Sequence, residues 1–231
     1  MSKKKVFLDL DDTIFDFGRA EDHALRQTLT ELGINVTDGV VSLYSKINDS
    51  CWKKLEKGEM TRVQILGGRF AMLFEALGVL GDPEKTWKLY ERNIGEQSFM
   101  LDGAVELLEE LSEKYELYGA SNGTASVQDR RIEKSGISRY FKDIFISQRV
   151  GFDKPDVRFF EIAFDEAGVT DKSECVMIGD SLTSDIKGGK NAGITTVWYN
   201  PKGKEPSPDI IPDYQASSLD MIPLVLEMIF A

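Results

Sequence analysis

The sequence predicts an α/β protein: a three-layer Rossmann-like core with a mainly parallel sheet, plus an inserted α-helical cap of four helices. Three observations predict it. Residues 5–10 form a short apolar run that ends in acidic residues, residues 18–95 show helical periodicity, and after Gly103 short apolar runs alternate with helical segments. Because repeated strand–helix units build parallel sheets, the first run belongs to the same sheet and the helical stretch is an insertion after it.

The insertion is predicted to be helical because its apolar residues, such as Ala24, Leu25 and Leu29, recur at three- and four-residue steps. Turn and helix-start signals divide it into about four helices. These signals stand at Gly33, Gly58, Gly78 and Asp82-Pro83. Four helices are enough for a small bundle, so we expect a cap domain over residues 17–95 and a catalytic core over residues 1–16 and 96–231.

The rest of the core shows the alternation of strands and helices most clearly. Strands are predicted near residues 116–120, 143–146, 174–178 and 195–198, and helices near residues 104–114, 125–135, 157–167 and 184–192. Residues 200–212 carry four prolines and are expected to form an extended loop.

The composition limits the classes of partner. The formal net charge of −11 opposes binding to a polymeric nucleic acid. A small phosphorylated metabolite is compatible with this charge, because a metal ion and a few local cations reverse the field inside a pocket.

No secretion signal and no apolar stretch of about 20 residues is visible, so we expect a cytoplasmic protein that does not enter a membrane. The apolar neighbours of Cys175 favour a reduced thiol over a disulfide with Cys51. The sequence leaves monomer and homodimer open.

The first polar cluster is Asp9-Leu10-Asp11-Asp12-Thr13, directly after the first predicted strand. Taken alone, such a cluster also fits a solvated loop or a helix cap. In the functional interpretation, Asp9 attacks phosphorus directly, because a carboxylate is ionised at neutral pH without a helper base. Asp11 faces the same pocket, protonates the departing oxygen and later deprotonates the hydrolytic water.

A second cluster supplies candidate metal ligands. An anionic nucleophile and a dianionic phosphate repel each other, so positive charge must lie near them. Gly179-Asp180-Ser181 follows another apolar strand and, with Asp185, offers the hard oxygen ligands that Mg²⁺ prefers. The same residues also fit a helix N-cap. We predict Mg²⁺ as the cofactor.

Two further clusters offer groups for the phosphoryl oxygens. Lys154, next to Pro155, can bind phosphate, with a solvated lysine as the ordinary alternative. Ser121-Asn122-Gly123 offers a hydroxyl and backbone N–H groups, with a simple turn as its alternative. All four clusters fall at the carboxyl ends of predicted strands, where open parallel sheets bind ligands. Together they predict a phosphatase that acts through a phosphorylated aspartate.

The motifs resemble those of the haloacid dehalogenase-like hydrolase superfamily. Its four signatures occur in order over essentially the whole chain, as Asp9-x-Asp11-x-Thr13, Ser121, Lys154-Pro155, and Gly179-Asp180-Ser181 with Asp185. The resemblance implies that Asp9 is the nucleophile, that Asp11 is the acid/base, and that the helical insertion is a mobile cap that excludes water. The implied metal ligands are Asp9, Asp11 through its backbone carbonyl, Asp180 and Asp185. The implied phosphate-binding residues are Thr13, Ser121, Asn122, Gly123 and Lys154.

A closer similarity is to the bacterial pyrimidine 5′-nucleotidases of this superfamily. It is carried by residues 9–17, by the cap stretch 52–74 and by Ser121-Asn122-Gly123. It implies a nucleoside monophosphate as the small phosphorylated partner. A nucleotide base needs an aromatic or apolar platform, so the candidate substrate contacts are Phe15, Phe17, Trp52 and Arg62, with core packing as the alternative for each aromatic ring.

Other readings of the same motifs stay open. A phosphatase of sugar phosphates or phosphoglycolate, or a phosphomutase, would use the same residues. Dehalogenation is disfavoured, because a halide leaving group needs no proton and the family's true dehalogenases lack a carboxylate at the position of Asp11. A phosphoacceptor signalling module is the non-enzymatic alternative, but its acceptor aspartate lies on a later strand and no large insertion follows the first strand.

Overall fold

The structure is a computed structural model and describes residues 3–231. The chain forms two compact units. The core unit comprises residues 3–16 together with Phe99–Ala231, and the helical unit comprises Phe17–Ser98. The helical unit is inserted in the sequence between the first and second strands of the core unit. The predicted fold class is confirmed, since a parallel sheet with helices on both faces carries an inserted segment of four helices.

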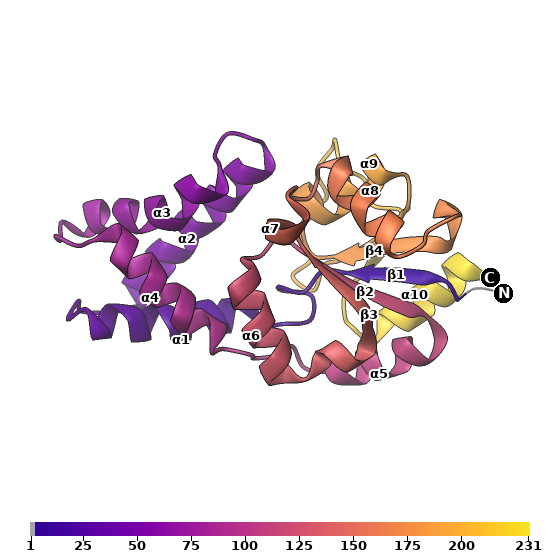
Figure 1. Ribbon diagram of the computed structural model, residues 1–231, viewed down its shortest axis with the longest axis horizontal. Helices are drawn as coiled ribbons and strands as arrows, with labels where there is room; N and C mark the ends of the chain where they lie inside the picture. The colour runs from indigo at the N-terminus through magenta and orange to yellow at the C-terminus, as the bar shows by residue number, and fades with distance from the viewer. Residues whose placement is uncertain (1–2) are drawn as a thin grey trace. The chain divides into compact units, whose positions relative to one another are not determined.

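The sheet of the core unit has six parallel strands, in the spatial order β3 (Phe141–Ile146), β2 (Glu116–Ser121), β1 (Lys5–Leu8), β4 (Cys175–Gly179), β5 (Thr195–Tyr199) and β6 (Tyr214–Ala216). β1 lies between β2 and β4 (Figure 1), and Leu8 is opposite Gly119 of β2 and Ile178 of β4. The chain adds β2 and β3 on one side of β1 and the later strands on the other. The carboxyl ends of β1, β2 and β4 therefore meet at the switch point where such sheets bind ligands.

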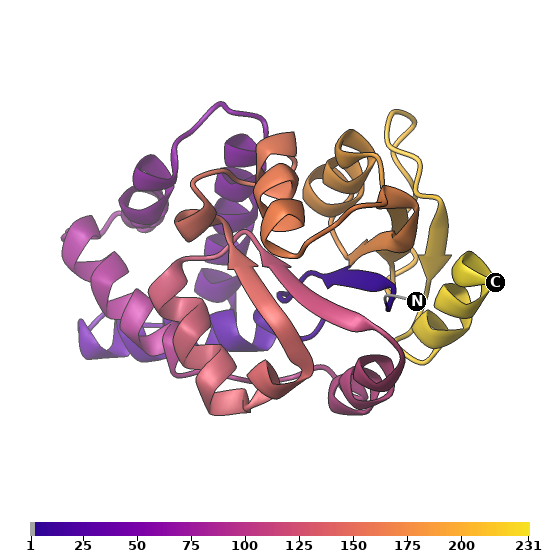
Figure 2. The same ribbon diagram turned by 45° about the vertical axis from the view of Figure 1, so that its right-hand side comes forward.

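Helices cover both faces of the sheet (Figures 1 and 2). Val6 and Leu8 pack in the cluster on one face and Phe7 in the cluster on the other, as the two-residue repeat of a strand requires. The first face is covered by α5 (Ala104–Lys114), α6 (Ala125–Ser135) and α10 (Met221–Phe230), and the second by α8 (Val157–Glu166) and α9 (Lys187–Ala192).

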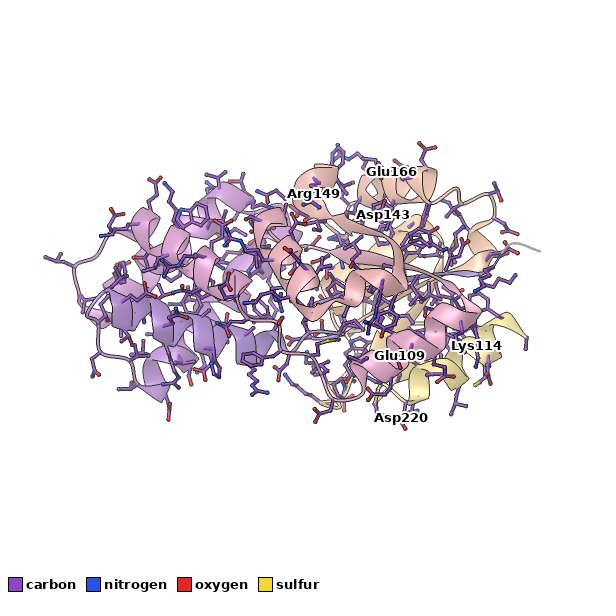
Figure 3. All side chains as sticks on the ribbon, turned by 60° about the horizontal axis from the view of Figure 1, so that its bottom comes forward. Glu109, Lys114, Asp143, Arg149, Glu166 and Asp220 are labelled. Carbon is purple, nitrogen blue, oxygen red and sulfur yellow. The ribbon has the colours of Figure 1, made fainter. Side chains whose placement is uncertain are left out.

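The end of the core unit contains elements that were not predicted. Strand β6 has three residues, too few to show an alternation of apolar and polar side chains. Helix α10 contains Pro223 in its first turn, where the missing N–H breaks no helical hydrogen bond. Lys114 at the end of α5, labelled in Figure 3, joins α10 through an ion pair of 3.0 Å with Glu227. The short helix α7 (Ser147–Val150) was also not predicted. The helix predicted over residues 184–192 is a short π-helix, η3 (Leu182–Ile186), followed by α9.

The helical unit consists of α1 (Phe17–Glu31), α2 (Asp38–Glu56), α3 (Arg62–Leu77) and α4 (Pro83–Gly95). Local signals fix its helix ends: Thr61 and Gln64 form a capping box at the start of α3, and Gly78 ends that helix in the left-handed conformation. Tyr44 and Phe70 stack inside the unit with ring centroids 5.2 Å apart. Among the described residues, no helix has both the length and the hydropathy needed to cross a membrane.

Candidate active site

The first motif forms a tight loop at the carboxyl end of β1. The Asp9 backbone N–H donates to the Ile178 carbonyl at 2.9 Å, so Asp9 extends the pairing of β1 with β4 by one residue. Asp12 then adopts a φ of 56°, in the left-handed region that aspartate tolerates, and its N–H donates to the Phe15 carbonyl at 2.8 Å. This turn fixes Asp9 and Asp11 at the edge of the sheet.

Lys154 is the cation nearest to Asp9. Its side chain is only 1% exposed, and its ammonium donates to Asp9 Oδ1 at 2.8 Å, to Asp185 Oδ1 at 2.6 Å and to the Ala120 carbonyl. Asn122 holds the backbone of Lys154 by two hydrogen bonds of 2.8 Å, one from its amide to the Lys154 carbonyl and one from the Lys154 N–H to Asn122 Oδ1. The Asn122 side chain therefore positions Lys154, and the predicted contact of this segment's backbone N–H groups with phosphate stays a prediction.

The carboxylates of Asp9, Asp180 and Asp185 form a cluster, with one oxygen of each within 4.8 Å of the others. Asp185 is fixed because its Oδ2 accepts a bond of 3.0 Å from the Ser181 N–H. The buried Trp198 indole donates to the Asp180 carbonyl at 2.8 Å and holds the loop after β4. The two predicted metal ligands after β4 thus lie beside the predicted nucleophile.

The electrostatics of this cluster show an excess of negative charge. Burial raises the pKa of Asp9 well above its ordinary value of 3.8, against the opposing effect of Lys154, and the carboxylates of Asp185, Asp11 and Asp180 raise it further. Burial and the Asp185 carboxylate also raise the pKa of Asp180. Burial opposes the charge of Lys154, but Asp185 and Asp9 outweigh it and raise the Lys154 pKa above its usual range. One buried ammonium therefore does not neutralise three carboxylates.

The cluster fits a hard divalent cation. Its donors are carboxylate oxygens, which Mg²⁺ prefers, and a second positive charge would offset the burial and the repulsion that together raise the pKa values of Asp9 and Asp180. Among residues 3–231, the side chain of Asp11 is not part of this group of oxygens. The expected contribution of Asp11 to the metal site, through its backbone carbonyl, stays a prediction.

The side chain of Asp11 bonds instead to two residues of α6 that were not predicted. Arg131 Nη1 donates to Asp11 Oδ1, and Gln128 Nε2 donates to Asp11 Oδ2 at 2.8 Å. Gln128 Nε2 also donates to Ser121 Oγ at 2.7 Å, so the predicted acid/base and the predicted phosphate-binding hydroxyl share one partner. The sequence signal was weak, because two polar residues three positions apart on a helix are also typical of a solvated face.

Three further predicted residues, Thr13, Phe15 and Gly123, pack against the interior of the core unit. Thr13 is fully buried, and within residues 3–231 its hydroxyl has no hydrogen-bond partner. The Phe15 side chain is also 0% exposed and packs in the core, 4.4 Å from the Arg131 guanidinium carbon. This burial favours core packing, the alternative given for its ring, and a contact of Phe15 with substrate stays a prediction. Gly123 packs its backbone against Gln128, where an added Cβ would lie 2.5 Å from Cγ.

The remaining candidate contacts belong to the helical unit. Phe17 is the first residue of α1 and is half-buried. Trp52 on α2 donates its indole N–H to Asn48 Oδ1 at 3.1 Å, and the Arg62 guanidinium lies 5.4 Å from the Trp52 ring centroid. Their role in substrate binding stays a prediction.

Gly179 gives a test of the acidic cluster. A Cβ at this position would lie 2.2 Å from Asp185 Oδ2, so Gly179→Ala must displace that carboxylate. We expect the variant to lose about 10- to 100-fold in kcat and to need more Mg²⁺ for half-maximal activity, as for other displaced metal partners. Gly119→Ala is the matched control, because its Cβ would meet the apolar Ile144 at 2.7 Å. The free energy of unfolding of both variants should fall by about 1–3 kcal/mol. An unchanged Mg²⁺ requirement in Gly179→Ala would contradict the assignment of the acidic cluster as the Mg²⁺ site.

The chain is similar to known proteins along nearly its whole length. A family model for haloacid dehalogenase-like hydrolases matches residues 3–193. The HAD-hydrolase YfnB of Bacillus subtilis is 36% identical in sequence over 97% of this chain and 96% of its own. The crystal structure of YfnB bound to magnesium superposes on this chain with a TM-score of 0.93. The superposition covers 98% of this chain and 99% of that one.

Two relatives carry names that state an activity. The pyrimidine 5′-nucleotidase PynA of Streptococcus pneumoniae is 38% identical, over 94% of this chain and 92% of its own. The pyrimidine 5′-nucleotidase YjjG of Escherichia coli is 32% identical over 93% of each chain. These matches confirm the resemblance drawn from the motifs. The protein is an enzyme that belongs to the family of haloacid dehalogenase-like hydrolases.

Proposed function

We propose that the protein is a Mg²⁺-dependent phosphatase that hydrolyses nucleoside monophosphates, pyrimidine nucleotides in particular, through a phosphorylated Asp9. The observation that carries this proposal is the placement of Asp9, at the tip of the central strand, in contact with a buried ammonium and beside two further carboxylates. A carboxylate so placed is a nucleophile with positive charge at hand for an incoming phosphate.

In the first step, an oxygen of Asp9 attacks phosphorus, and the bond between phosphorus and the ester oxygen breaks. The electron pair stays on the leaving oxygen, which takes a proton from Asp11. Lys154 and the Ser121 hydroxyl bind the oxygens of the phosphoryl group, and the backbone N–H groups around Gly123 assist. The product alcohol then leaves, and the phosphoryl group remains on Asp9.

In the second step, Asp11 accepts a proton from water as the water oxygen attacks phosphorus. The bond from phosphorus to Asp9 breaks, and its electron pair restores the carboxylate, so inorganic phosphate leaves. Asp11 thus returns to its protonated state after each turnover, and one residue serves as acid and then as base. Its carboxyl group is accessible, since the side chain of Asp11 is 29% exposed.

Asp9, Asp180 and the Asp11 carbonyl would hold the cation, with Asp185 supporting the site. When bound, Mg²⁺ neutralises negative charge on the phosphate and on the carboxylates around it. Lys154 still contributes, because it fixes the orientation of Asp9 by a bond of 2.8 Å and holds Asp185 at 2.6 Å. The oxygen donors and their uncompensated charge support this assignment.

The substrate class is inferred from the relatives named as pyrimidine 5′-nucleotidases, at 38% and 32% identity over nearly the whole chain. Sugar phosphates and phosphoglycolate carry the same phosphate ester on a different leaving group. They are therefore the comparison substrates.

The test is phosphate release from a panel of pyrimidine and purine nucleoside monophosphates, sugar phosphates and phosphoglycolate, with and without EDTA. We expect kcat/KM for UMP, CMP or dTMP to exceed that for sugar phosphates by at least about tenfold, the scale of one good binding contact. EDTA should abolish turnover and added Mg²⁺ should restore it.

Different outcomes separate the parts of the proposal. Activity that EDTA leaves intact would contradict the metal assignment. Preference for a sugar phosphate would overturn the substrate class but keep the chemistry. Transfer of phosphate to another sugar hydroxyl, seen as an isomeric product without phosphate release, would identify a mutase.

A further inference from the structure

Gln128 and Arg131 connect two functional groups of the core unit. Gln128 Nε2 lies 2.8 Å from Asp11 Oδ2 and 2.7 Å from Ser121 Oγ, and Arg131 Nη1 bonds both Asp11 Oδ1 and, at 2.9 Å, Gln128 Oε1. Asp11 belongs to the first-motif loop, whereas Ser121, Gln128 and Arg131 lie close together in a later segment. Asp11 and Arg131 are separated by 120 residues. The network is thus a product of the tertiary fold.

The donors and acceptors of this network have one consistent assignment. A guanidinium can only donate, so the Gln128 atom that faces Arg131 is the carbonyl oxygen. The amide nitrogen of Gln128 therefore faces Asp11 and Ser121 and uses its two hydrogens on them. Ser121 accepts in this contact, so its own hydroxyl hydrogen points elsewhere and is available to another acceptor. Arg131 in this way sets the direction of Ser121 as well as of Asp11.

Burial makes the network rigid. Arg131 is 0% exposed and Gln128 is 1% exposed, and the Arg131 guanidinium lies 4.4 Å from the centroid of the buried Phe15 ring. On its other side, Gln128 packs against the backbone at Gly123, where no Cβ would fit. A cation buried this completely is costly unless it is well paired, and its carboxylate partner here is Asp11.

We propose that Arg131 and Gln128 are positioning residues that hold the Asp11 carboxyl group in the orientation needed for proton transfer to the leaving oxygen. The inference rests on the proposed function, since it assigns Asp11 the acid/base role. Each oxygen of Asp11 bonds a different residue, so the pair fixes both torsion angles of the side chain. Lys154 pairs with Asp9 and Arg131 pairs with Asp11, so the nucleophile and the acid/base are held by different cations.

The test uses the difference between two leaving groups. A nucleoside monophosphate releases a basic alkoxide that needs a proton, whereas p-nitrophenyl phosphate releases a stable phenolate that does not. In Arg131→Met, we expect kcat/KM to fall about 100-fold for UMP, the scale of a misplaced catalytic group, but by less than about fivefold for p-nitrophenyl phosphate. Asp11→Asn should show the same pattern more strongly.

The matched control is Arg130→Met, which removes an exposed arginine from the same helix and should leave both activities unchanged. If Arg131→Met does not fold, Arg131→Lys keeps the charge but loses the planar fork, and it should show a smaller loss with the same dependence on the leaving group. When Arg131→Met is added to Asp11→Asn, kcat/KM for UMP should fall by less than about threefold relative to Asp11→Asn alone, because Arg131 acts through Asp11.

Two results would overturn the inference while leaving the proposed function intact. One is an equal loss on both substrates, which a merely structural role or a phosphate-binding role would give. The other is a full additional loss in the Asp11→Asn background. If the unmodified protein shows no phosphatase activity, or if Asp11→Asn keeps normal turnover of UMP, the proposed function itself fails.

Discussion

Asp9→Asn is expected to lower kcat for every phosphate ester by roughly 10⁴-fold or more, the scale seen when a covalent nucleophile is removed. An amide cannot form the acyl phosphate, so no second residue replaces the lost step. The measurement is phosphate release under saturating substrate and Mg²⁺. Asp209→Asn, in the exposed loop after β5, is the matched control and should retain full activity.

The same variant separates chemistry from folding. Because burial raises the pKa of Asp9 above its ordinary 3.8, ionised Asp9 opposes folding, and this cost develops as the pH rises from the unfolded value through the raised one. In EDTA at neutral pH, Asp9→Asn should therefore have a free energy of unfolding at least equal to that of the unmodified protein. An inactive but clearly destabilised variant would instead indicate a structural role for Asp9.

Lys154→Met is expected to have the second-largest effect. It removes the ammonium that bonds Asp9 and Asp185, and it leaves two buried carboxylates without that partner. We expect kcat/KM to fall by about 10³-fold, as on loss of a charged donor to the reacting group. In EDTA the free energy of unfolding should fall by roughly 3–5 kcal/mol, as when one partner of a buried ion pair is lost.

Added Mg²⁺ distinguishes this role from simple packing. With the ammonium gone, the cluster is more negative, so Mg²⁺ should raise the Tm of Lys154→Met by more than that of the unmodified protein. Lys187→Met removes an exposed lysine at the start of α9 and should change neither Tm nor kcat/KM. Near-normal kcat/KM in Lys154→Met would contradict the placement of Lys154 in the reaction.

The motifs could be placed from the sequence because Asp9 follows β1, Ser121 ends β2 and Asp180 follows β4, whereas Lys154 comes after β3 and the short helix α7. In a parallel sheet the carboxyl ends of neighbouring strands share an edge, so Lys154 and Asp9 meet although 145 residues separate them. The helical insertion was recognisable because its caps are local signals, such as Thr61 with Gln64 and Asp82 before Pro83.

Gln128 and Arg131 were not identified from the sequence, because both bond Asp11, a partner distant in the chain. Gln128 and Arg131 carry the pattern of an exposed helical face, and only the packing of α6 against the first-motif loop shows that both are buried. The bonds of the Asn122 side chain to the Lys154 backbone were likewise not predicted, because the two residues lie 32 positions apart in the chain. Phe15 has the aromatic character of a ligand contact, and its burial in the core could not be read from its neighbours.

The central claim, that Asp9 carries the phosphoryl group, is tested most directly by acid-quenching the enzyme during turnover of UMP and mapping the modified peptide by mass spectrometry. The account predicts one phosphorylated peptide, which contains Asp9 and is absent from Asp9→Asn and from EDTA-treated enzyme. A phosphoryl group on any other residue, or active turnover with inversion of configuration at phosphorus and no phosphoenzyme, would contradict it.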